Sequence, residues 1–105
     1  MSGKLAGLDL TVANTDQQLY VVPVSKVTSL TVCFANRNAQ TVKVRLALTT
    51  TTSPANTDYI AYDIAVPAND SYERSGLALG AGQYVYVRSD TVGVSVAAWG
   101  FEDAV

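Results

Sequence analysis

Residues 41–49 read "TVKVRLALT", and this stretch decides the fold class. Apolar side chains occupy every second position, and the two cations lie between them. A period of two is typical of a half-buried β-strand. A shift of one residue would bury both cations, so the sequence predicts which side faces the core. The predicted core-facing residues are Val42, Val44, Leu46 and Leu48, and the predicted outward residues are Lys43, Arg45 and Ala47.

The same alternation recurs along the chain, which predicts about eight short strands divided by turn signals. Glu and Lys, good helix formers, are scarce, whereas β-branched residues are plentiful. We therefore expect an all-β fold, a single-domain antiparallel β-sandwich of jelly-roll or immunoglobulin-like type over residues 1–105. The other predicted strands include 5–12, 18–24, 27–36, 59–66, 83–89 and 92–102, with a brief extended segment within 76–82.

Two nearly identical phrases, Pro54–Asp58 and Pro67–Asp70, flank the predicted strand 59–66. Proline fixes φ, and Asn and Asp side chains cap turns, so each phrase predicts a turn. A shared calcium ion is the alternative, but Asp58 and Asp70 would stand at opposite ends of a strand about 27 Å long. Within this strand the predicted sides are Ile60, Tyr62, Ile64 and Val66 against Tyr59, Ala61, Asp63 and Ala65.

Several connections have turn chemistry of their own. The Asn-containing stretch 35–40 suits a short hairpin, and glycines in 76–82 suit a tight turn. Pro23 suggests an edge strand or a bulge. The small residues at 1–7 form a candidate flexible arm onto a neighbour, with a frayed terminus as the alternative.

Composition excludes several classes of partner. The formal net charge is −2 and the cations are scattered, so no nucleic acid is expected. No stretch approaches the ~20 apolar residues of a membrane helix, and the start of the sequence does not resemble a secretory signal. The single cysteine, Cys33, cannot form an internal disulfide, so the fold does not depend on an oxidising compartment and we expect a protein made in the cytoplasm.

Catalytic chemistry is not indicated either. The chain has no histidine, which removes the commonest general base and metal ligand and leaves Cys33 without its usual partner. Most carboxylates lie beside predicted turns, and Asp63 lies mid-strand with its side chain predicted outward. The glycine-rich stretch 76–82 lacks the lysine of a phosphate loop. We therefore expect no catalytic residue, no metal, no cofactor and no enzymatic activity.

Aromatic residues near the end of the chain are the candidate partner interface: Tyr84 and Tyr86 on one side of a strand, Trp99 and Phe101 on the next. They lie opposite rows of valine in what we expect to be a C-terminal hairpin. Three interpretations stay open: a second core layer, a partner interface, or a platform for sugar binding.

The order of several short motifs resembles that of a group of small virion structural proteins of tailed bacteriophages. The pattern runs from a Tyr-x-Val-Pro strand and Asn-Arg, through Val-x-Val-Arg-Leu-Ala and Asp-Tyr-Ile-x-Tyr-Asp, to a closing Gly-Phe-Glu. It spans roughly residues 5–102 and departs at Pro23–Lys26, where Pro-Ala-Gly-Lys is expected. The matching segments are Tyr20–Pro23, Asn36–Arg37, Val42–Ala47, Asp58–Asp63, Val66–Asn69, Glu73–Gly80, Val85–Ser89 and Gly100–Glu102.

The resemblance implies a β-sandwich displayed on a virion, most plausibly a capsid decoration or cement protein that binds the major capsid protein. The alternative is a neck, tail or fibre component that acts as a receptor- or carbohydrate-binding module. A homo-oligomer suits repeated attachment to a lattice, and a trimer on local three-fold axes would fit. The resemblance brings no catalytic residues.

Overall fold

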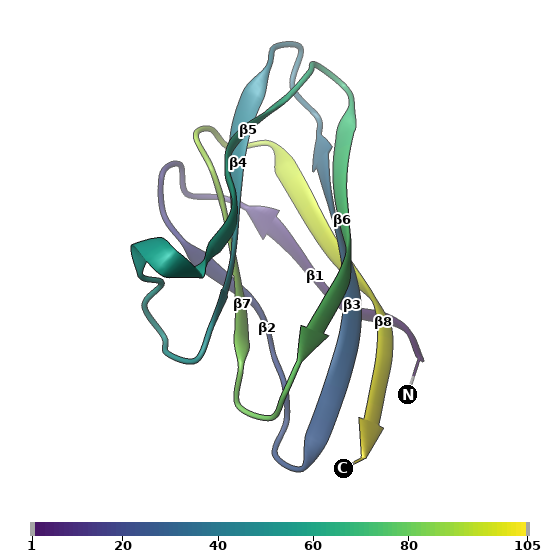
Figure 1. Cartoon of the computed structure of the whole chain (residues 1–105). Helices are drawn as coiled ribbons and strands as arrows, with labels where there is room; N and C mark the ends of the chain where they lie inside the picture. Colours follow the sequence, from purple (N-terminus) through teal and green to yellow (C-terminus); the bar gives the residue numbers. More distant parts are fainter. Residues whose placement is uncertain (1, 105) are drawn as a thin grey trace.

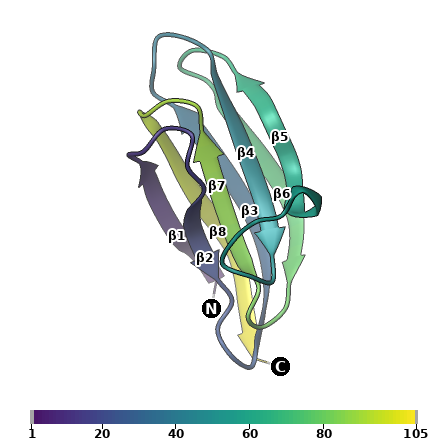
Figure 2. The same ribbon diagram turned by 90° about the vertical axis from the view of Figure 1, so that its left-hand side faces the viewer.

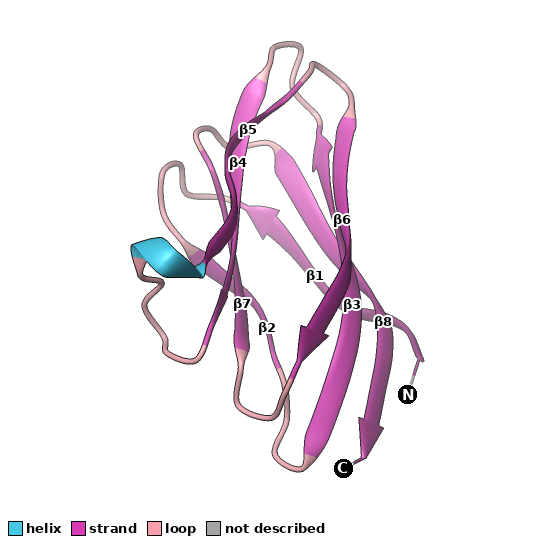
Figure 3. Cartoon of the chain, in the orientation of Figure 1, coloured by secondary structure: helices cyan, strands magenta, loops and turns pink. Residues whose placement is uncertain are grey.

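The computed structural model describes residues 2–104, which form two antiparallel four-stranded sheets packed face to face (Figure 1). Sheet A has the strand order β1-β8-β3-β6, and sheet B has the order β2-β7-β4-β5. Helical structure in this part of the chain is a single 3-10 turn, η1 (Figure 3). The predicted β-sandwich is confirmed. Its elements are β1 (Ser2–Leu10), β2 (Gln17–Val21), β3 (Lys26–Asn36), β4 (Val42–Thr49), η1 (Asn56–Asp58), β5 (Tyr59–Val66), β6 (Ser71–Leu79), β7 (Tyr84–Ser89) and β8 (Val94–Ala104).

The strands pair in a nested order, from the ends of the chain inward. β1 pairs with β8, β2 with β7, β3 with β6, and β4 with β5. Two further pairs, β3 with β8 and β4 with β7, join these ribbons at the centre of each sheet. Figure 2 shows the resulting order in sheet B, which faces the viewer. Eight strands nested in this way form a jelly roll, one of the two expected types.

The core lies between the sheets and follows the predicted alternation. In β3, Leu30, Val32 and Phe34 are fully buried, and in β7, Val85 and Val87 are fully buried. The jelly roll is stabilised chiefly by removing these apolar side chains from water. Other fully buried side chains are Leu10, Val22, Val42, Val44, Leu46, Val66 and Val94.

In β4 the predicted sides hold except at Ala47, which is fully buried although predicted outward. Its lateral neighbours on the adjacent strands are Tyr59 and Tyr86, whose large side chains flank the small one. Leu48 packs against the core but is only partly buried. The alternation was therefore read correctly, and the burial of Ala47 comes from the side chains beside it on the outer face.

In β5 the predicted sides are wrong in the middle of the strand. Tyr62 was expected in the core but is 55% exposed, whereas Ala61 is buried. The register with β4 shifts between Val44 and Leu46, so two residues of β5 stand opposite Arg45. Such a bulge reverses the side on which the following residues point. Asp63, within the bulge, has φ of 53° and points outward as predicted.

The stretch 35–40 is a turn, but not the predicted hairpin. β3 lies in sheet A and β4 in sheet B, so the turn carries the chain across the sandwich. The side-chain amide of Asn36 donates hydrogen bonds to the carbonyls of Gln40 at 2.9 Å and Pro67 at 3.0 Å, and its carbonyl accepts from the backbone of Asn38. The Asn residues were enough to predict a turn. They could not predict which sheet β4 joins, because that depends on pairing with strands distant in the sequence.

The two proline-containing phrases are turns at opposite ends of β5, as predicted. At the first, the Asp58 carboxylate accepts a hydrogen bond from the backbone of Ala55 at 2.8 Å in the η1 turn. At the second, Asn69 has φ of 57° and Asp70 donates its backbone N–H to Pro67 at 3.1 Å. The separation of the two phrases removes a common cation site.

Residues 2–7 are not the flexible arm that the sequence suggested. They belong to β1, whose pairing with β8 begins at Ser2 opposite Phe101. Backbone hydrogen bonding to β8 holds this segment in sheet A, because a paired strand satisfies donors and acceptors that a free arm would leave to water. The remaining residue of the proposed arm, Met1, lies outside the described residues.

The edges of both sheets differ from their centres. The central pairs, β3 with β8 and β4 with β7, keep one register throughout. Every pair that involves an edge strand (β1, β6, β2 or β5) contains a register shift. Irregular edges resist pairing with a further strand. Pro23 follows β2, an edge strand, in agreement with its predicted position at an edge.

Candidate interaction surfaces

Each sheet has one outer side, and these two surfaces contain the candidate site residues. We call the outward side chains of β1, β8, β3 and β6 the sheet A face. Those of β2, β7, β4 and β5 are the sheet B face. Tyr84 and Tyr86 lie on β7, and Trp99 and Phe101 lie on β8, so the predicted interface is divided between opposite faces. The expected hairpin of these strands is also wrong, because β7 and β8 belong to different sheets.

On the sheet A face, two large aromatic side chains stand among small ones. Trp99 is 51% exposed and Phe101 is 61% exposed. On β3, their lateral neighbours are Thr31 beside Trp99 and Ser29 beside Phe101. Half or more of each side chain is exposed, which removes the interpretation of a second core layer here.

The next row across the sheet A face consists mainly of small residues. It runs from Gly7 on β1, through Ala97 and Cys33, to Glu73 on β6. Together with Trp99, the first three residues of this row line a shallow hollow of about 590 Å³. Small side chains in the middle of a sheet face leave room for groups from a second molecule.

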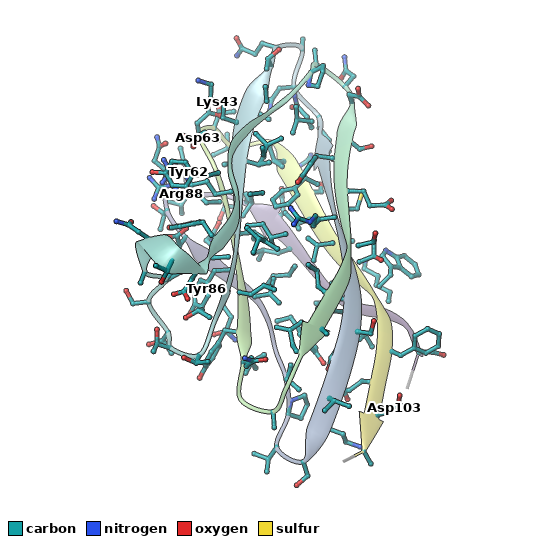
Figure 4. The ribbon with its side chains drawn as sticks, in the orientation of Figure 1. Lys43, Tyr62, Asp63, Tyr86, Arg88 and Asp103 are labelled. Atoms are coloured by element: carbon teal, nitrogen blue, oxygen red, sulfur yellow. The ribbon has the colours of Figure 1, made fainter. Side chains whose placement is uncertain are left out.

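A second hollow, of about 420 Å³, lies at the other side of Phe101. Its walls include Val27, Ser29 and Ala78, which are apolar or small, and Asp103 lies at its rim. Val27 is 42% exposed. Figure 4 places Asp103 on β8, on the opposite side of the sandwich from the labelled sheet B residues.

Three charges on the sheet A face have no ion-pair partner within residues 2–104. They are Asp103 on β8, Lys4 on β1 and Glu73 on β6, all exposed, and the last two occupy the edge strands of the sheet. Space beside Gly7 is filled by Lys4, since a Cβ at Gly7 would lie 3.1 Å from its Cε atom. A second cation, Arg37, is already paired with Asp9 at 2.5 Å.

Cys33 lies between Lys4 and Glu73. Burial raises the pKa of its thiol, and the negative charge of Glu73 raises that pKa further. The thiolate is the nucleophilic form of cysteine, so both influences make Cys33 less reactive at neutral pH.

The sheet B face is organised around Arg45. Its Nε atom lies 2.7 Å from Oδ1 of Asp63, and its Nη2 atom lies 3.3 Å from Oδ2. The guanidinium also stacks over Tyr62, 3.9 Å from the ring centroid. The β5 bulge places both partners opposite Arg45. The hydrogen bonds from Arg45 lower the pKa of Asp63 below its usual value.

Tyr59 extends this cluster across sheet B. Its ring meets Tyr62 edge to face at 5.3 Å, and its hydroxyl donates to Asp16 at 2.8 Å. Arg88 lies 3.9 Å from the same carboxylate. Burial, followed by the hydrogen bond to Asp16, raises the pKa of Tyr59. Figure 4 shows Tyr62, Asp63 and Arg88 gathered on one side of sheet B.

The predicted tyrosines of this face are less available than the tryptophan and phenylalanine of the other. Tyr86 is only 8% exposed, and Tyr84 is partly buried with its ring 6.2 Å from that of Tyr86. Sequence reasoning missed the Arg45, Tyr62 and Asp63 cluster. The available signal was the side-by-side pairing of "VKVRL" with "YIAYD", but a bulge had to be known before Tyr62 could be placed outward.

Several of the motifs that carry the resemblance to phage virion proteins contact one another in the folded chain. The Tyr20 hydroxyl hydrogen-bonds the Glu102 carboxylate, which joins the first motif to the last. Asn36 donates to the carbonyl of Val66 at 3.1 Å, and Arg45 pairs with Asp63. These contacts connect residues that are distant in the sequence. The motifs therefore have a structural role, and none of them by itself indicates a binding site.

Residues 2–104 contain no cluster of three or more His, Cys, Asp or Glu side chains that could hold a metal ion. The same residues include no helix long and apolar enough to cross a membrane. No protein-family model, curated protein or solved structure matches the chain. The two faces of the jelly roll therefore carry the functional argument.

Proposed function

We propose that the chain is a non-enzymatic virion structural protein of a tailed bacteriophage, which decorates or cements the outer capsid as a symmetric oligomer. The observation that carries this proposal is the exposure of Trp99 and Phe101 on the sheet A face. Aromatic side chains dominate the binding energy of protein interfaces, and exposed apolar patches mark interaction sites. The proposal rests on the resemblance for the kind of particle.

The jelly roll supports this proposal by analogy, because viral capsid proteins use the same arrangement. The irregular edge strands favour association of copies through a face. Attachment at many equivalent lattice positions would let a modest interface suffice, since neighbouring copies add to one another's binding.

The test is the copy number per purified particle, measured by quantitative mass spectrometry against the major capsid protein. Hundreds of copies are expected for a decoration protein. A matched pair of variants, Trp99→Ser and Tyr62→Ser, tests the face: the first should reduce the copy number and the second should not. Absence of the chain from purified particles would overturn the proposal.

A neck, tail or fibre module that binds a receptor carbohydrate is the second candidate. It is favoured by Trp99 beside the hollow lined by Lys4, Asp9 and Ser95, since aromatic rings and polar groups together bind sugars. Trp99 is the only tryptophan, so its fluorescence reports this site directly. A saturable change on adding host-surface saccharides, with only a few copies per particle, would favour this function.

A further inference from the structure

We propose that the sheet A face binds a second copy of this chain, in a dimer whose two-fold axis runs along the strands midway between β3 and β8. This inference rests on the proposed oligomeric assembly and names its first contact. It replaces the trimer suggested earlier as the basic unit, because a face that binds itself generates a two-fold axis.

Pairing through an edge is the common alternative for two β-sandwiches. All four edge strands contain register shifts in their pairing, and irregular edges resist extension by another strand. Face-to-face packing of two sheets is the remaining route, and aligned sheets pack about 10 Å apart with interdigitated side chains.

The sizes of the outward side chains complement one another under the proposed rotation. Rotation about an axis along the strands reverses their order, so β8 of one copy lies over β3 of the other. Trp99 then lies over Thr31 of the second copy, and Phe101 lies over Ser29. Each large ring meets a small side chain, twice over, which allows the faces to interdigitate.

The charges are complementary under the same rotation. The backbone of Lys4 on β1 pairs with Trp99, but its side chain extends over Gly7, where a Cβ atom would lie 3.2 Å from the Lys4 Nζ atom. The row of Gly7 ends at Glu73 on β6. Three strand spacings, about 14 Å, separate the two edge strands, so one copy cannot pair these charges itself. Reversal of the strand order places Lys4 over Glu73 of the second copy, and the symmetry repeats this pair on the other side.

The perpendicular two-fold axis gives a poorer fit. It would set β8 over β8 and β1 over β1, so Lys4 would lie three strand spacings from Glu73 of the second copy. Charge complementarity therefore selects the axis along the strands.

The available area suits a weak dimer. Four strands at ~4.8 Å spacing, with about nine residues each at ~3.3 Å, give roughly 600 Å² per copy. The total of about 1,200 Å² lies at the lower end of specific interfaces. We therefore expect association that depends on concentration and is reinforced on a lattice.

Charge exchange gives the sharpest test, read by sedimentation velocity from micromolar to millimolar concentration. Lys4→Glu and Glu73→Lys should each weaken the dimer about tenfold or more, because two attractive contacts become repulsive. An equimolar mixture of the two variants should recover the wild-type affinity, since every facing pair is then opposite in charge. The double variant should recover it as well.

Lys43→Glu on the sheet B face is the matched control, because Lys43 is exposed and lies on the opposite side of the sandwich. It should leave the dissociation constant unchanged. Trp99→Ser should abolish the dimer, and wild-type dimerisation should shift the tryptophan emission to the blue.

Monomeric behaviour of the wild type at millimolar concentration would overturn the dimer. Failure of the mixture to recover affinity after both single variants had lost it would overturn the proposed axis. Dimerisation as described by a chain absent from purified particles would support the dimer and overturn the proposed virion function. A chain that is abundant on particles but never dimerises would support the virion function and overturn the dimer.

Discussion

The two outer faces of this sandwich use similar residues in opposite ways. On the sheet B face, Arg45 is held by Asp63 and stacked on Tyr62 within one molecule. On the sheet A face, Lys4 and Glu73 have no ion-pair partner among the described residues, and Trp99 is 51% exposed.

Exposure alone therefore does not identify an interface. Tyr62 is about as exposed as Trp99, at 55% against 51%. One face of the Tyr62 ring is already occupied, because the guanidinium of Arg45 lies over it at 3.9 Å from the centroid. Groups whose partners lie within the chain stabilise the monomer, whereas groups without such partners are available to a second molecule.

Gly100→Ala should have the largest effect, because Gly100 lies between Trp99 and Phe101 in the central pair of sheet A. A Cβ atom there would lie 1.9 Å from the carbonyl oxygen of Ser29. That oxygen belongs to the backbone of β3, so the strands themselves would have to move apart. We expect a loss of about 3–5 kcal/mol in the free energy of unfolding, measured with urea.

Gly82→Ala is the matched control for this prediction. Gly82 also has positive φ, at 79°, but a Cβ atom there would meet nothing within 4 Å. It should cost only about 1 kcal/mol, the strain of the backbone angle. Equal losses for the two variants would contradict a steric basis for the glycine beneath the sheet A face.

Tyr86→Ser and Trp99→Ser test the two faces directly. Tyr86 is 8% exposed and beside Ala47, so loss of its ring should cost about 2–3 kcal/mol of unfolding free energy. Trp99 is half exposed, and its loss should cost less than about 1 kcal/mol in the monomer. Thermal and urea unfolding at low protein concentration measure both losses of unfolding free energy. A larger loss for Trp99→Ser than for Tyr86→Ser would contradict the proposed difference between the faces.

The sequence predicted the fold well wherever strand pairs keep one register. The strands predicted at 27–36, 83–89 and 92–102 correspond to β3, β7 and β8, and burial in β3 and in the first half of β8 alternates with the predicted period of two. Prediction failed within β5, because the extra residue near Asp63 leaves no signal in composition. A bulge is fixed by the neighbouring strand, and that strand's register was unknown.

The candidate site was predictable in part for the same reason. Local alternation places Trp99 and Phe101 on the side opposite Val94 and Val96 but leaves open whether that side is covered, and in the structure half or more of both side chains is exposed. Their separation from Tyr84 depends on which sheet receives each strand, which local turn chemistry does not specify. The placement of Lys4 and Glu73 on one face likewise requires the order β1-β8-β3-β6, a property of the whole chain.

The pH dependence of stability should distinguish the faces by a smaller effect. Arg45 lowers the pKa of Asp63, so this pair contributes stability above the carboxyl's ordinary pKa of 3.8. That contribution should be lost as the pH falls further, through the lowered value. Asp63→Asn should flatten this acid limb in urea titrations, whereas Glu73→Gln on the sheet A face should leave it unchanged. An unchanged limb in Asp63→Asn would contradict the pairing.

The smallest expected effect concerns the reactivity of Cys33. Burial and the charge of Glu73 both raise the pKa of its thiol, and no cation within the described residues is paired with Glu73 to cancel that charge. Glu73→Gln should therefore increase the thiolate fraction, and the alkylation rate at pH 8, by about twofold to threefold. Asp63→Asn is the control on the sheet B face and should leave the rate unchanged. Measurement at dilutions that keep the chain monomeric separates this electrostatic effect from shielding by a second copy. An alkylation rate that Glu73→Gln leaves unchanged would mean that solvent screens the Glu73 carboxylate completely. The proposed difference between unpaired charges on the sheet A face and paired charges on the sheet B face would then be contradicted.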